Sequence, residues 1–163
     1  MRRKSRRLEH GGVDLAACVL RERDSVRVWS LGEATDSEGA LIQRFFDGIE
    51  KYTPQIVSWN GGGFDLPVLN YRGLIHGVHA ARFWDQGEDD RDFKWNNYIS
   101  RYHARHLDLM DLMAMYQPRA AAPLDDIAQL MGFPGKIGIG GAFVNKDADF
   151  GAVAKFLASE LAA

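Results

Sequence analysis

The most constraining feature of the sequence is a short apolar segment that runs into three glycines and then into a helical pattern. Residues 55–59 (QIVSW) are apolar and β-branched, which predicts a buried strand. Asn60 and the glycines at 61–63 follow, and glycine allows the backbone to turn tightly. From Phe64 onward, apolar residues recur at helical spacing as far as Gly77. The segment therefore predicts a strand, a glycine loop and a helix, as in α/β domains.

The segments before this unit predict a hairpin and an amphipathic helix. Residues 13–20 and 26–32 are apolar or alternating and flank a charged turn at 21–25, which predicts two antiparallel strands. Helical spacing then runs through residues 41–49, with an acidic start at 36–38. We expect this helix to end before the Thr-Pro pair that follows it.

The segments after the unit have weaker patterns. Residues 84–105 are rich in charge and aromatics without a clean period, so we expect a long surface excursion with one helical turn. Residues 106–116 are compatible with either a short strand or a helix. Residues 123–132 predict a helix with Pro123 in its first turn and Gly132 as its end. The order of elements predicts an α/β domain with a mixed sheet that is antiparallel at its start.

Composition limits the class of protein. A length of 163 residues suits one domain with a real core, and we expect a disordered basic tail at 1–12 followed by a single domain at 13–163. No apolar run approaches the roughly 20 residues of a membrane span, so we expect no membrane partner. The only cysteine, Cys18, excludes an internal disulfide and indicates a reducing, cytoplasmic setting.

The charge distribution argues against a broad phosphate-binding surface. Without its first ten residues the chain has 15 basic and 21 acidic residues, so the remainder is mildly acidic although the formal net charge of the whole chain is only −2. If nucleic acid is the partner, it would have to bind at a local site.

Asp65 is the sharpest candidate for chemistry. It is predicted at the start of a helix beyond the carboxyl end of a strand, where open α/β sheets bind ligands, and a carboxylate there can hold a divalent cation. The alternative is that Asp65 is an acidic residue favourably placed at a helix N-terminus and that Asn-Gly is a turn. The glycines match neither of the two phosphate-binding fingerprints.

The sequence of this segment resembles a motif of a known family. Residues 60–72 contain N-x-x-x-F-D followed by L-P-x-L-x-x-R, which resembles the second exonuclease motif of 3′-5′ exonucleases with the ribonuclease-H-like fold. More narrowly, the chain resembles predicted 3′-5′ exonucleases related to the proofreading domain of family-B DNA polymerases. Residues 18–33, 43–49, 93–113 and 123–136 are similar to the same group, so the resemblance covers 18–136.

The resemblance implies a fold, a reaction and roles for individual residues. The fold is a ribonuclease-H-like mixed sheet with flanking helices, and the reaction is hydrolysis at DNA 3′ ends or in single-stranded DNA by two Mg²⁺ or Mn²⁺ ions held by four carboxylates. Asp65 matches the metal carboxylate of the second motif. Asn60 and Phe64 match positions that meet the terminal nucleotides, and Arg72 ends the motif as a candidate nucleic-acid contact.

The chain departs from the family pattern near both ends. The first motif, D-x-E before the hairpin, is absent, and the one D-x-E, at residues 36–38, fits helix capping better. The third motif, Y-x-x-x-D after Lys136, is also absent, and Asp147 and Asp149 match it poorly. We therefore expect the resemblance to stop near residues 17 and 137 and the fold to be incomplete at its N-terminal strand and C-terminal helix. Altered reading frames or a misplaced start would produce this.

Other residues are weaker candidates. Asp108 is a possible second metal carboxylate, since Asp111 would lie on the same helix face three residues later; the alternative is an ordinary structural role. Trp95 stands in a stretch of aromatic and basic residues suited to single-stranded nucleic acid, or to burial under a loop. Lys136 is placed near phosphate by the family resemblance, or lies in a plain turn.

Three functions remain open from the sequence. The first is a 3′-5′ exonuclease, and the second is an inactive, truncated or frame-altered remnant that only binds single-stranded nucleic acid. The third is a metal-independent α/β binding module. Whether the substrate is DNA or RNA stays open, and the sequence indicates no protein partner.

Overall fold

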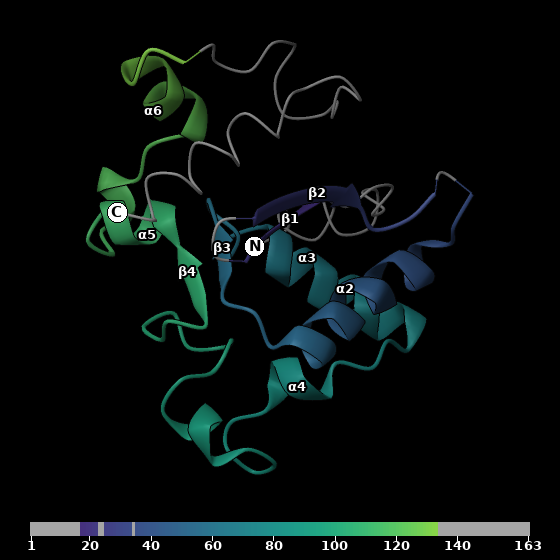
Figure 1. The fold of residues 1–163 in the computed structure, drawn as a ribbon. Coiled ribbons are helices and arrows are strands. Elements are labelled where there is room, and N and C mark those ends of the chain that lie inside the picture. The colour runs from purple at the N-terminus through teal and green to yellow at the C-terminus, as the bar shows by residue number, and fades with distance from the viewer. Residues whose placement is uncertain (1–16, 23–24, 34, 134–163) are drawn as a thin grey trace, which may run out of the picture. The chain divides into compact units, whose positions relative to one another are not determined.

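The structure, a computed structural model, describes residues 17–22, 25–33 and 35–133 (Figure 1). These residues divide into two compact units. The smaller unit contains the described part of 17–31 together with 123–133, and the larger contains the described part of 32–122. The predicted tail at 1–12 lies outside the described residues. A single domain over 13–163 stays a prediction.

The smaller unit contains the predicted hairpin. Strand β1 (Ala17–Glu22) pairs antiparallel with β2 (Ser25–Ser30), in a register that runs from Ala17 opposite Ser30 to Glu22 opposite Ser25. The Ser25 hydroxyl donates to the Glu22 carbonyl over 3.0 Å and links the two strands at this end of the pair. The hairpin prediction is confirmed.

The same unit contains helix α6 (Leu124–Leu130), which the sequence also predicted. We expected Pro123 in the first turn of this helix, but it precedes the helix as its N-cap. Gly132 has a φ of 80°, a left-handed conformation that is available to glycine without strain and ends the helix.

The larger unit is built on helix α2 (Glu38–Tyr52), which packs against α3 (Asp65–His76) and α4 (Ala81–Trp84). The Ser37 hydroxyl caps α2 by accepting from the Ala40 N–H over 3.3 Å. Glu38 forms an ion pair with Arg72 and a 2.7 Å contact with His76, both on α3. The D-x-E sequence at 36–38 therefore serves capping and helix pairing, as predicted.

The core of this unit is largely aromatic, and it overturns one expectation. The buried side chains come from α2, α3, α4 and the segment after α4: Ile42, Phe46, Ile49, Leu66, Phe83, Phe93 and Tyr98. Residues 84–105 contribute Phe93, which is fully buried, and Tyr98, whose ring stacks on Phe83 with centroids 5.7 Å apart. This segment contains the expected helical turn, the 3₁₀ helix η1 (Arg91–Lys94), but it is not a surface excursion.

The second sheet positions the candidate site. Strand β3 (Ile56–Ser58) pairs parallel with β4 (His106–Asp108), with Ser58 opposite Asp108. Helix α5 (Leu109–Met113) and the 3₁₀ helix η2 (Pro118–Ala120) follow, so residues 106–116 contain both a strand and a helix. The α/β class is confirmed. In the described part of the chain the strands form two separate pairs, one antiparallel and one parallel, and no helix there is long and apolar enough to cross a membrane.

Candidate functional site

The site begins at the loop between β3 and α3. Asn60 adopts a left-handed φ of 62°, and its carbonyl accepts from the N–H groups of Gly63 and Phe64 at 3.1 and 3.0 Å. A Cβ at Gly61 would lie 2.3 Å from the Ser58 hydroxyl oxygen, so a larger residue cannot fit without a shift. The glycines therefore allow the chain to turn back tightly over the end of β3.

Asp108 holds this loop in place from the neighbouring strand. Its Oδ1 accepts from the backbone N–H of Asn60 at 2.8 Å and its Oδ2 from that of Gly62 at 2.9 Å. Oδ1 also accepts from Met110 N–H at 3.2 Å, which caps α5. Because Asp108 is only 9% exposed, these donors replace the water that a carboxylate needs. Asp108 ends β4 and caps α5, so the expectation that it shares a helix face with Asp111 is wrong.

His106 lies beneath the same loop. Its Nε2 is 2.8 Å from the Ser58 hydroxyl oxygen across the parallel strands. Burial lowers the pKa of His106, although the negative charges of Asp108 and Asp111 act in the opposite direction. The ring is therefore mainly neutral near pH 7 and acts as a hydrogen-bonding group.

Asp65 has a different environment from Asp108. It is the first residue of α3 and is exposed, and no other described residue forms a hydrogen bond with its carboxylate. Partial burial raises the pKa of this carboxyl, its own backbone N–H lowers it, and the negative charge of Asp108 raises it further. A cation at this point would relieve the repulsion between the two carboxylates.

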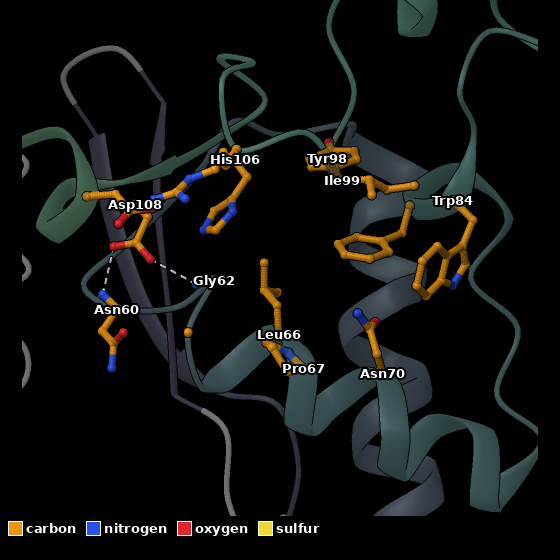
Figure 2. Close-up of a pocket in the computed structure, with 14 residues that line it drawn as sticks. Asn60, Gly62, Leu66, Pro67, Asn70, Trp84, Tyr98, Ile99, His106 and Asp108 are labelled. Atoms are coloured by element: carbon orange, nitrogen blue, oxygen red, sulfur yellow. Dashed lines mark hydrogen bonds and ion pairs between the residues drawn. The ribbon is translucent and has the colours of Figure 1, made fainter. Parts of the chain in front are cut away.

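A pocket of about 450 Å³ lies beside the loop, a size typical of small-molecule sites. Figure 2 shows Asn60, Gly62 and Asp108 at one end of it and Asn70 with Trp84 at the other. The walls are completed by Gly63, Leu66, Pro67, Phe83, Tyr98, Ile99, Arg101, His106 and Asp111. The pocket thus has an acidic end and an aromatic end.

The described residues do not by themselves complete a site for a divalent ion. No group of three or more potential ligands is found in the described part of the chain. Asp108 already accepts three backbone N–H groups, and Asp111 accepts from the Arg101 guanidinium at 2.7 Å. Asp65 is the carboxylate that stays available, and one carboxylate binds Mg²⁺ weakly.

The structure brings some of the predicted residues together and leaves others apart. Asn60 lines the pocket, and Phe64 and Asp65 belong to the same loop and helix start without lining it. Arg72 lies further along α3 in its ion pair with Glu38. Trp95 is 77% exposed and lies outside the pocket, with the Lys94 ammonium 5.3 Å from its ring centroid. Lys136, Asp147 and Asp149 lie outside the described residues.

Asn70 and Trp84 are among the pocket residues that sequence reasoning missed. Asn70 follows Leu66 by four positions on α3, and residues four apart share a helix face, so the helical pattern could have revealed it. Trp84 ends α4 at the start of a segment without period, where no local signal indicates which face of the molecule it lines.

A model of one protein family matches residues 7–158, and its description is "Predicted 3'-5' exonuclease related to the exonuclease domain of PolB". The match extends past both ends of the 18–136 segment, so the expectation that the resemblance stops near 17 and 137 is wrong. Comparisons with curated proteins and with solved structures gave no match. Since the family model spans well over half of the sequence, the chain belongs to the family of predicted 3′-5′ exonucleases related to the exonuclease domain of family-B DNA polymerases.

Proposed function

We propose that this chain is a 3′-5′ exonuclease domain that removes nucleotides from the 3′ end of single-stranded DNA, with Asp65 as its metal-binding carboxylate. The observation that carries the proposal is the state of that carboxylate. Asp65 is exposed at the start of α3, beyond the carboxyl ends of two parallel strands, and no other described residue forms a hydrogen bond with its carboxylate. Such a charge is stabilised by a divalent cation, which the family generally uses.

The neighbouring residues suit a nucleic-acid end. Phe64 is 51% exposed directly before Asp65, so its ring is available for stacking on a base. Asn60 lines the pocket with its backbone fixed by Asp108. Asp108 is better suited to holding the loop than to direct metal binding, because its oxygens already accept three N–H groups.

The fold and the setting are part of the same proposal. We expect a ribonuclease-H-like mixed sheet with flanking helices, and we keep Arg72, Trp95 and Lys136 as candidate nucleic-acid contacts. A cytoplasmic setting is our expectation from the lone cysteine.

The family match does not favour the inactive-remnant alternative. That alternative arose from the missing first and third motifs and from the view that both flanks cease to resemble the family, and the second of these grounds does not hold because the family match covers residues 7–158. The departures from the first and third motifs remain, so the activity has to be measured.

The test is release of 3′ nucleotides from 5′-labelled single-stranded DNA and RNA in Mg²⁺, in Mn²⁺ and in excess chelator. We expect metal-dependent shortening from the 3′ end by the wild-type chain and loss of at least 100-fold in rate for Asp65→Ala, on the order of the loss of one transition-state stabilising group. Asp47→Ala is the matched control, since Asp47 is an exposed aspartate that bonds Gln43 on α2. Equal rates for wild type and Asp65→Ala would refute the proposal.

A further inference from the structure

Asn70 carries an unusual buried atom. Its side-chain oxygen Oδ1 is shielded from solvent, and no described residue donates a hydrogen bond to it. A buried acceptor without a donor costs about 1–3 kcal/mol, so such atoms are rare in folded proteins. Asn70 also lines the pocket, and a rotation of its side chain would bring Oδ1 to the pocket surface, where a ligand could supply the missing donor.

Trp84 lies at the same end of the pocket and is held there by the core. Its ring is 49% exposed, and it meets the buried Phe83 edge to face, with centroids 5.3 Å apart and an interplanar angle of 88°. Phe83 in turn stacks on the buried Tyr98. A tryptophan that is anchored on one side and open on the other provides a stacking surface at little entropic cost.

The pocket thus pairs a flat aromatic surface with an amide, at the end opposite the acidic groups. Figure 2 shows Asn70 and Trp84 together on one side and Asp108 with Asn60 on the other. A nucleotide is divided in the same way. At one end it has a planar base with apolar faces, and at the other a phosphate, which a cation can link to carboxylates. The volume of about 450 Å³ lies within the range for one ligand of this size.

We propose that the aromatic end of this pocket receives one unpaired nucleobase, which stacks on Trp84 while its N–H edge donates to Asn70 Oδ1. This inference rests on the proposed function, because it takes nucleic acid as the substrate. Every base offers a donor next to an acceptor on its pairing edge, which an amide complements by presenting both groups. The pocket therefore requires an unpaired base but does not choose strongly among the four, and it rejects an abasic unit.

The test combines binding and stability in two variants. Binding of labelled single-stranded DNA is measured by fluorescence anisotropy in excess chelator, so that no cleavage intervenes. We expect Trp84→Ala and Asn70→Leu each to weaken binding about 5-fold or more, and Trp84→Phe to retain most of it. Tyr52→Ala, which removes an exposed aromatic side chain outside the pocket, is the control for the loss of Trp84.

Stability separates a ligand-binding role of Asn70 from a structural one. Asn70→Leu removes an acceptor that lacks a donor, so the melting temperature should stay the same or rise while binding falls. If the melting temperature and the affinity fall together, Asn70 serves the fold and the proposal is wrong.

A set of oligonucleotides with one abasic unit, moved through the last positions before the 3′ end, locates the bound base. At one position the abasic unit should weaken wild-type binding, and should cost nothing further in Trp84→Ala. If wild type binds and shortens DNA but no abasic position matters, this inference fails and the proposed function stands. If wild type neither binds nor shortens nucleic acid, both fail.

Discussion

Removal of the Asp108 carboxylate should release the glycine loop that carries the candidate site. In Asp108→Ala, the backbone N–H groups of Asn60 and Gly62 lose their acceptor, and α5 loses its N-cap. Asp108→Asn is a graded change, because its oxygen can still accept from Asn60 and Met110, whereas its amide nitrogen faces the N–H of Gly62.

The structure sets the expected size of these effects. Loss of an N-cap costs about 1 kcal/mol, and a hydrogen bond to a charged group contributes about 1.5–3 kcal/mol. The lower end of that range applies here, since Gly62 is exposed and water can reach its N–H. The free energy of unfolding should therefore fall by about 4 kcal/mol in Asp108→Ala and by about 2 kcal/mol in Asp108→Asn.

Urea denaturation followed by tryptophan fluorescence measures these differences. The matched control is Asp111→Ala, which breaks an ion pair with Arg101 whose side chains are 29% and 48% exposed. Such a pair contributes less than about 1 kcal/mol. If Asp108→Ala costs no more than the control, the loop is not held by Asp108 and its carboxylate is free for another role.

Three further predictions concern the core, the loop and acid stability. In urea denaturation, Phe93→Ala should lower the free energy of unfolding by about 3–5 kcal/mol, because Phe93 is fully buried. Trp95→Ala, at an exposed residue of the same segment, should lower it by less than about 0.5 kcal/mol. Equal effects would show that Phe93 is not part of the core. Gly61→Ala, whose Cβ would lie 2.3 Å from a side-chain oxygen, should lower the melting temperature more than Gly62→Ala, whose Cβ would lie 3.3 Å from one. Burial opposes ionisation of Asp85, but four backbone N–H groups together hold its pKa below the usual range. Asp85→Asn should therefore lower the melting temperature at neutral pH, and this deficit should shrink as the pH falls below about 4 towards the native pKa, where the wild-type carboxylate also becomes protonated. A deficit independent of pH would contradict that account.

The elements that the sequence predicted are those with short-range causes. Helix α2 has an apolar face and a serine N-cap, and the hairpin has alternating strands around a charged turn. Strand β3 and the glycine loop are signalled by β-branched residues and by glycines, of which the one at position 61 leaves no room for a Cβ unless Ser58 shifts. In each case the determining residues lie within a few positions of one another.

The segment at 84–105 could not be predicted because its burial depends on distant partners. The Tyr98 hydroxyl donates to the Pro54 carbonyl at 2.6 Å, and Phe93 packs in a cluster with residues from α2 and α4. The Asp85 carboxylate accepts hydrogen bonds from the N–H groups of residues 87–90, and these residues do not form a regular helix or strand. A segment ordered by one carboxylate and two buried rings has no hydrophobic period to detect.

The two aspartates of the site show why local sequence could place one of them and not the other. Asp65 stands in the strand–loop–helix unit, so its position could be predicted from its neighbours. The position of Asp108 depends on β3 pairing parallel with β4, which places it opposite Ser58 and under a loop nearly fifty residues away. An aspartate can bind a metal ion, but three backbone N–H groups already donate to the carboxylate oxygens of Asp108. The availability of a carboxylate to a ligand depends on how many donors it already accepts, and for that reason we propose Asp65, and not Asp108, as the carboxylate that binds a cation.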